Sequence, residues 1–184
     1  NAVYPAETFE RLDNPYHGWV AWASDDITLD PKAQSFQTVY LDIKWAELEA
    51  VKGVYDFAAV EEKYHLNDWK ERGVRGVLRF VMDDVIDNGG APRMDIPKWL
   101  YDELVAENWN GKGAGTFYYE PEDLGGGGFS PNYESPILLD YHGKAVAALA
   151  ERFDDPAITA YVQVGSLGHW AEMHCWPDGT GEFP

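Results

Sequence analysis

The sequence predicts an α/β fold, namely a parallel (β/α) half-barrel that contains the first four strands of a TIM-type (β/α)8 barrel. Apolar runs rich in β-branched and aromatic residues alternate with segments of helical periodicity, which is the βαβα pattern of a parallel sheet. Long loops follow the carboxyl ends of the predicted strands. Because a closed barrel needs about 250 residues, we expect residues 1–184 to form a single domain equal to half a barrel. A small doubly wound α/β domain is the structural alternative.

The first part of the chain predicts two strands and a helix. The segment WVAWA (19–23) is short and apolar, and TVYLDIKW (38–45) is rich in β-branched and aromatic residues, so both are expected to be strands. A helix is expected from about 58 to 72, with Asp56 as its N-cap and apolar residues along one face. Gly73 is expected to end this helix as a C-cap glycine.

The second part predicts two more strands around a long insertion. RGVLRFVM (75–82) predicts the third strand and ITAYVQVG (158–165) the fourth. The insertion at about 84–133 is far longer than a usual strand–helix connection, and we expect it to contain a short helix at IPKWLYDEL and a flexible GGGG loop. Ser135 and Pro136 open a further helix as N-cap and first-turn residues. Its apolar face is predicted to consist of Leu139, Val146, Leu149 and Phe153.

The composition narrows the classes of ligand. Aromatic residues make up 15% of the chain and include eight Trp and eleven Tyr. Such rings are common on carbohydrate-binding surfaces, where they stack on sugars, although a large aromatic core would give the same composition. The formal net charge of −18 repels phosphate backbones and anionic lipids, so we expect no nucleic-acid and no membrane partner. A neutral carbohydrate ligand is compatible with this charge, which also fits a purely solubilising role.

The sequence does not predict an internal disulfide, a membrane span, a nucleotide site or a metal site. The single cysteine, Cys175, cannot form an internal disulfide, and no apolar run approaches the roughly 20 residues of a membrane span. No Gly-rich phosphate loop lies at a strand–helix turn, so we expect no nucleotide and no other cofactor. His169, Glu172 and His174 have the spacing H-x-x-E-x-H, which matches neither common zinc pattern, so no metal site is predicted.

Two segments resemble those of (β/α)8 glycoside hydrolases such as the family 42 β-galactosidases. WAELEAVKGVYDF (45–57) is similar to the segment after their second strand, where a Trp leads to a Leu-Glu turn and Gly-x-Tyr-x-Phe enters the helix. IPKWL (96–100) resembles the Pro-x-Trp-Leu element after their third strand.

Other segments look closer to the uncharacterised glycosidase-like barrel proteins classed as domains of unknown function 4832 and 4874. These segments are NPYHGW near the start, LRF (78–80) and GSLGHWAEMH (165–174). The last run of those proteins is usually Gly-x-x-Gly-x-Trp-Gly-Glu-Trp-His, whereas here Ala171 replaces a Gly and Met173 replaces a Trp. The resemblance follows the chain in order and implies the N-terminal half of a glycoside-hydrolase-like barrel.

The resemblance implies that Glu172 is a general acid/base, because in the enzymes resembled this residue follows the fourth strand. Its neighbours Trp170, Met173 and Trp176 are expected to form the partly apolar surrounding that raises the pKa of a carboxyl group. The partner nucleophile of such barrels follows the seventh strand, which this chain does not include. Glu172 could equally be a ligand-binding or structural carboxylate that is hydrogen-bonded to His169.

Further candidate residues lie near the ends of the predicted strands. Asp83 and Asp84 follow the third strand and could bind sugar hydroxyls or cap a turn. Arg79 could pair with a carboxylate at the barrel mouth or form a structural salt bridge. The Trp side chains are either sugar-stacking platforms or parts of the core. The predicted substrate-binding residues are Trp170, His169, Asp83, Arg79, Trp99 and Trp45.

Three functions follow from these observations. The first is a carbohydrate-active hydrolase in which Glu172 protonates the glycosidic oxygen. The second is a non-catalytic carbohydrate-binding protein that uses the same aromatic mouth. The third is a half-barrel whose apolar sheet edge pairs with the remaining half of the barrel or with another chain.

Overall fold

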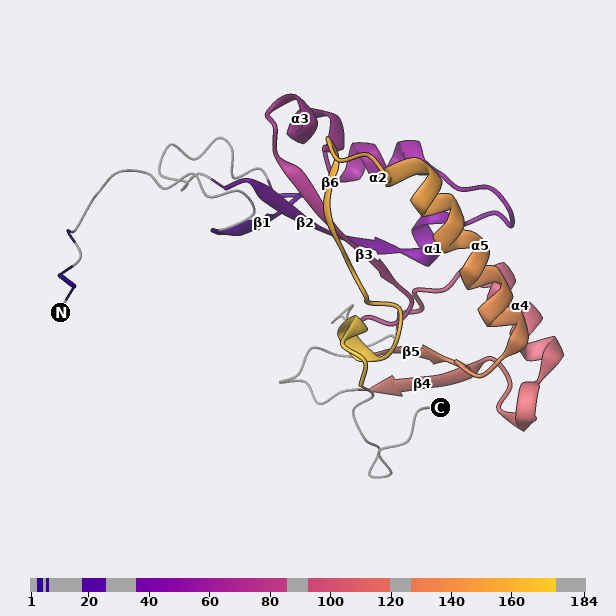
Figure 1. Ribbon diagram of the computed structural model, residues 1–184. Helices are drawn as coiled ribbons and strands as arrows, with labels where there is room; N and C mark the ends of the chain where they lie inside the picture. The colour runs from indigo at the N-terminus through magenta and orange to yellow at the C-terminus, as the bar shows by residue number, and fades with distance from the viewer. Residues whose placement is uncertain are drawn as a thin grey trace.

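The fold is α/β, as predicted, and combines a parallel sheet with a small antiparallel one (Figure 1). The computed structural model describes residues 3–4, 6, 18–25, 36–85, 93–119 and 127–174. Within these ranges the parallel sheet has four strands in the order β1-β2-β3-β6, and strands β4 and β5 form the antiparallel pair.

The parallel strands lie side by side in the order in which they occur along the chain. They are β1 (Val20–Trp22), β2 (Thr38–Lys44), β3 (Arg75–Val81) and β6 (Thr159–Gln163). Every neighbouring pair is parallel, and the register places Leu41 beside Leu78 and Leu78 beside Val162. The four strands predicted from the apolar runs are therefore present, each within its expected range.

The two faces of the sheet differ in what covers them. Val39, Leu41 and Ile43 of β2 are buried and belong to the main core, together with Leu78 and Phe80 of β3. The alternate residues Tyr40 and Asp42 are half-buried and are not part of that core. Because side chains alternate along a strand, the buried residues of β2 lie on the face that the helices cover (Figure 1), and Tyr40 and Asp42 lie on the other face.

The connection from β2 to β3 forms three short helices where one was predicted. They are α1 (Trp45–Leu48), α2 (Phe57–Lys63) and α3 (Leu66–Glu71). Asp56 caps α2 as expected, because its side chain accepts the Ala59 N–H at 3.0 Å. The expected single helix is broken at His65, whose φ of +52° lies in the left-handed region. The break lets Trp69 pack inward and donate its Nε1–H to the Ala23 carbonyl at 3.0 Å.

The long insertion contains more structure than was predicted. The expected helix is α4 (Lys98–Glu107), followed by the 3-10 turn η2 (Trp109–Gly111) and a hairpin of β4 (Gly115–Tyr119) and β5 (Gly127–Pro131). The expectation of a flexible loop is wrong for Gly127 and Gly128, which lie in β5. Gly128 is required there, because a Cβ would lie 2.3 Å from the Tyr118 hydroxyl. Residues 125 and 126 are outside the described ranges.

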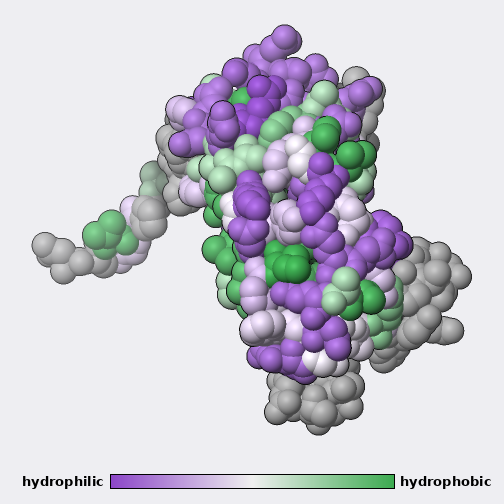
Figure 2. All heavy atoms as spheres, turned by 90° about the vertical axis from the view of Figure 1, so that its right-hand side faces the viewer, coloured by the Kyte–Doolittle hydropathy of each residue, from purple (hydrophilic) through white to green (hydrophobic). Residues whose placement is uncertain are grey.

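The last helix, α5 (Pro136–Phe153), begins as predicted but presents a different face. Ser135 caps it by accepting the Leu138 N–H at 3.1 Å. The predicted apolar face is partly wrong, because Leu139 and Val146 are 58% and 42% exposed. The fully buried residues are Leu138, Ala145 and Phe153. Viewed from the helical side, the surface is mainly hydrophilic with separate hydrophobic spots (Figure 2).

Candidate functional site

The ends of β3 and β6 bring two predicted segments together. Residues 82–85 follow β3, and the 165–174 loop follows β6 and contains the 3-10 turn η4 (His169–Ala171). The Ala171 N–H donates to the Asp83 carbonyl at 3.3 Å, and the Ser166 hydroxyl donates to the Phe80 carbonyl at 3.0 Å. This juxtaposition follows from the parallel sheet, because the carboxyl ends of its strands lie along one edge.

The 165–174 loop has an unusual backbone. Trp170, Ala171 and Met173 have φ values of +51°, +57° and +60°, in a region that side chains other than Gly rarely adopt. The loop closes on itself, because the His169 N–H donates to the His174 carbonyl at 2.7 Å. At Gly168 a Cβ would lie 2.4 Å from that same carbonyl oxygen, so the loop requires glycine here. Such strain persists only where surrounding contacts hold it, and it is concentrated at functional sites.

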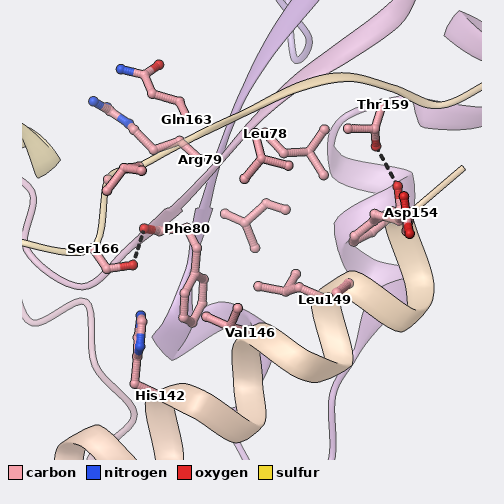
Figure 3. Close-up of a pocket in the computed structure, with 16 residues that line it drawn as sticks. Leu78, Arg79, Phe80, His142, Val146, Leu149, Asp154, Thr159, Gln163 and Ser166 are labelled. Atoms are coloured by element: carbon pink, nitrogen blue, oxygen red, sulfur yellow. Dashed lines mark hydrogen bonds between the residues drawn. The ribbon is translucent and has the colours of Figure 1, made fainter. Parts of the chain in front are cut away.

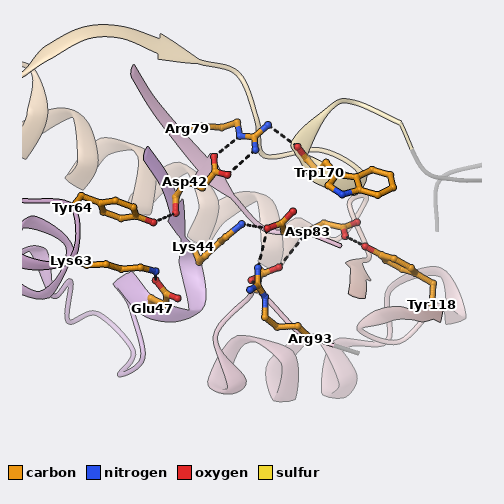
Figure 4. A network of polar contacts seen from close by, with 12 residues as sticks. Asp42, Lys44, Glu47, Lys63, Tyr64, Arg79, Asp83, Arg93, Tyr118 and Trp170 are labelled. Carbon is orange, nitrogen blue, oxygen red and sulfur yellow. Dashed lines mark hydrogen bonds and ion pairs between the residues drawn. The ribbon is translucent and has the colours of Figure 1, made fainter. Parts of the chain in front are cut away.

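Arg79 connects the 165–174 loop to strand β2 through hydrogen bonds (Figure 4). Its Nε–H and Nη2 donate to the two carboxylate oxygens of Asp42 at 2.7 and 2.9 Å. Its Nη1 donates to the Trp170 carbonyl at 2.7 Å. The predicted pairing with a carboxylate is therefore observed, and the guanidinium also holds the strained turn. Gly165 leaves room for it, because a Cβ there would lie 2.1 Å from the Arg79 Cγ.

Asp83 is buried and surrounded by hydroxyl groups. The side chains of Ser130, Tyr118 and Tyr133 all donate to it, with Ser130 at 2.6 Å and Tyr133 at 3.1 Å. Burial raises the pKa of Asp83 to about 6, and the hydroxyl hydrogen bonds act in the opposite direction. With Asp83 only 1% exposed, its carboxyl faces protein hydroxyls rather than an open surface.

Asp84, the neighbour of Asp83, lies in a separate group of charges that includes Lys44 and Arg93. It pairs with Lys44 and, at 3.1 Å, with Arg93, while its N–H donates to Asp95 at 2.9 Å. Burial is also the main cause that raises the pKa of Asp95. These side chains fix the start of the insertion relative to β2, and no sequence pattern indicated their pairing.

Glu172 lies on the outside of the loop. Its side chain is 60% exposed, so Trp170 and Met173 do not enclose it as expected, and the third expected neighbour, Trp176, lies outside the described residues. The positive φ of Trp170 and Met173 turns their side chains away from the position that a regular helix or strand would give them. The His174 Nε2 lies 3.3 Å from the Glu172 Oε2, so the imidazole next to this carboxylate is that of His174 rather than His169.

His169 is buried against the hairpin. Its ring stacks on the ring of Tyr118 with centroids 3.8 Å apart, and burial lowers the pKa of His169 to about 4. The imidazole is therefore neutral at physiological pH and has no spare proton to transfer.

The predicted Trp platforms lie in different places. Trp170 is half-buried on the loop, with its ring centroid 5.9 Å from that of His174. Trp45 is completely buried and donates to the Glu49 Oε2 at 2.7 Å, so the prediction of a sugar-stacking surface is wrong for this residue. Trp99 donates to the Glu49 carbonyl at 2.8 Å and packs on α5, and neither interaction involves the loop.

The hairpin residues around Asp83 were not anticipated. Tyr118, Ser130 and Tyr133 all belong to the insertion, whose hairpin the sequence analysis missed. A strand could have been predicted at the run TFYY (116–119), which has the β-branched and aromatic composition of a strand.

A groove of about 470 Å³ lies on the helical side, between α5 and β6 (Figure 3). Its lining is largely apolar and includes Phe80, Leu149 and Val162. Val162 and Val164 are 77% and 69% exposed, although Leu78, the neighbour of Val162 across the sheet, is buried. The helical side of the β6 edge is thus uncovered by any described element.

No family model matches the chain, and no curated protein matches it in sequence. In the described ranges, no group of three or more His, Cys, Asp or Glu side chains is placed to hold a metal ion. Among the described helices, none has the length and apolar character needed to cross a membrane.

Proposed function

We propose that the chain is a carbohydrate-active protein of glycoside-hydrolase type, with Glu172 as its general acid/base. The observation that carries this proposal is the strained 165–174 loop, which Arg79 and Asp83 hold at the carboxyl ends of the strands. The loop presents the Glu172 carboxyl group to solvent beside His174, whose ring centroid lies 5.9 Å from that of Trp170. An acid/base after the fourth parallel strand is what the resemblance implies.

The arrangement of the sheet supports a half-barrel over a doubly wound domain. In a doubly wound domain the strand order reverses and helices cover both faces. Here the described strands follow chain order, and the helices pack on one face. The uncovered groove beside β6 is where the next helix of a barrel would pack.

The proposed chemistry places Glu172 beside the scissile glycosidic bond. A sugar stacked on Trp170 would cover the exposed carboxyl group and exclude water from it. The protonated Glu172 then donates to the leaving-group oxygen. The second carboxylate that such hydrolysis needs follows the seventh strand in the enzymes resembled.

Non-catalytic carbohydrate binding is the second candidate function. It is favoured by the 60% exposure of the Glu172 side chain, because the hydroxyls of a bound sugar could reach the carboxyl group directly. In this case Trp170 stacks on the sugar, and Glu172 and His174 accept or donate hydrogen bonds to its hydroxyls.

The experiment compares the wild type with Glu172→Gln, Trp170→Ala and the control Glu151→Gln, which removes an exposed carboxylate from α5. Hydrolysis of aryl glycosides and sugar binding by calorimetry are both measured. Loss of hydrolysis with retained binding in Glu172→Gln supports the hydrolase. Binding that Trp170→Ala weakens, without any hydrolysis by the wild type, supports the second function. A wild type that neither binds nor hydrolyses any sugar contradicts both.

A further inference from the structure

Asp83 connects three parts of the chain that are distant in sequence. Its carboxyl group accepts hydrogen bonds from Tyr118 of β4, from Ser130 of β5 and from Tyr133, which follows β5. Asp83 itself follows β3, so one buried side chain joins the main sheet to the hairpin. Each hydroxyl bond to an ionised or neutral carboxyl group in a buried site contributes to holding these parts together.

Two routes lead from Asp83 to the 165–174 loop. The first is direct, because the Asp83 carbonyl accepts the Ala171 N–H at 3.3 Å. The second passes through Tyr133, whose hydroxyl donates to Asp83 and accepts the Gly168 N–H at 3.0 Å. A tyrosine hydroxyl has one proton. Donation of that proton to Asp83 therefore orients the Tyr133 oxygen to accept from Gly168.

We propose that Asp83 is a positioning residue, which fixes the 165–174 loop through Tyr133 and thereby sets the position of Glu172. The consequence for Glu172 rests on the proposed function, whereas the mechanical link between Asp83 and the loop does not. In this role Asp83 contacts no sugar, which replaces the substrate-binding role that the sequence suggested.

The hydrogen-bonded link between Asp83 and the 165–174 loop should weaken as the pH rises. Burial raises the pKa of Asp83 to about 6, so the closed arrangement prefers the protonated carboxyl group, and opening the loop to water favours the ionised one. As the pH rises through 6, the loop is therefore expected to open more readily. The titratable groups around Asp83 are Tyr118, Tyr133, His169, Asp95 and Asp84. Asp84 is paired with Lys44 and Arg93.

Two of these neighbours, His169 and Tyr118, keep their charge between pH 5 and pH 7. The pKa of His169 is lowered to about 4 by burial, so its ring stays neutral. The pKa of Tyr118 is raised by burial, so its hydroxyl stays protonated. Asp95 is the exception, because burial raises its pKa too, and it requires a control.

Hydrogen exchange of the 165–174 amides tests the proposal at pH 5 and pH 7, corrected for the intrinsic exchange rates. In the wild type, the equilibrium constant for opening the loop should increase about tenfold between pH 5 and pH 7. This is the ratio expected for a carboxyl group whose pKa is about 6 in the closed loop and about 4 in the open loop. Asp83→Asn keeps the shape and stays neutral, so its loop should show no such increase. Asp95→Asn should retain an increase, because the hydrogen bond and ion pair that the structure describes for Asp95 go to Asp84 and Arg93 rather than to residues 165–174. An increase that persists in Asp83→Asn overturns the proposal.

A second pair of variants tests the Tyr133 route without changing any carboxyl group. Tyr133→Phe and Tyr118→Phe each remove one hydroxyl from Asp83, but Tyr133 also binds the loop. Exchange at Gly168 should therefore be at least tenfold faster in Tyr133→Phe than in Tyr118→Phe at the same pH. Equal exchange at Gly168 in the two variants contradicts the proposed route. Neither measurement uses a sugar, so a failed sugar assay and a failed exchange experiment remain distinguishable.

Discussion

Replacing Asp83 with Asn should change how the stability of the whole domain depends on pH. The carboxyl group is 1% exposed, and its pKa is raised to about 6 from the ordinary value of 3.8. The folded state therefore binds a proton that the unfolded state has already lost between these two pH values. The resulting stabilisation is fully present below pH 3.8 and is lost as the pH rises through 6.

The size of this effect follows from the two pKa values. A difference between about 6 and 3.8 corresponds to about 3 kcal/mol, of which about 2 kcal/mol lies between pH 4 and pH 7. Urea unfolding of the wild type and of Asp83→Asn over this range gives the difference between their free energies of unfolding. This difference isolates Asp83, because all other titrating groups are common to both proteins. We expect the wild type to lose about 2 kcal/mol relative to the variant. A difference that is constant, or that grows with pH, would refute the reasoning.

Three further predictions concern the sheet, the core and the hairpin. Arg79→Met leaves the half-buried Asp42 carboxylate without its guanidinium partner and should lower the free energy of unfolding by about 3 kcal/mol in urea denaturation; a loss under 1 kcal/mol contradicts this. Trp45→Ala should lower it by about 4 kcal/mol, because the side chain is fully buried, and a near-neutral result would show that this ring is not part of the core. Gly128→Ala places a Cβ where it would lie 2.3 Å from the Tyr118 hydroxyl, so hydrogen exchange in the hairpin should become faster, and unchanged exchange would contradict the tight contact.

The strands were predictable because their signal is local. Buried parallel strands appear as apolar runs of β-branched residues, and all four runs became strands of one sheet. The break at His65 was not predictable, because it depends on Trp69 reaching the Ala23 carbonyl across the fold. The hairpin was missed because its two strands are separated by residues 120–126, and the glycines that begin β5 suggested a loop.

The candidate site was predictable in its location but not in its internal geometry. Parallel strands place their carboxyl ends at one edge, so Asp83 and the residues of the 165–174 loop were expected together, and they are in contact. Whether Trp45 faces a core or a surface depends on the packing of the helix that follows it. The exposure of Glu172 depends on the positive φ values on either side of it, which no sequence pattern indicated.

The leaving-group dependence of Glu172→Gln tests the proposed role of this residue most directly. A general acid matters most when the leaving group is a poor one, so kcat/KM for an alkyl or unsubstituted phenyl glycoside should fall by about 10² to 10⁴ in the variant. A dinitrophenyl glycoside needs no protonation on departure, and its cleavage step should be affected far less. Equal losses for both substrates, or no loss for either, would contradict the assignment of Glu172 as the acid.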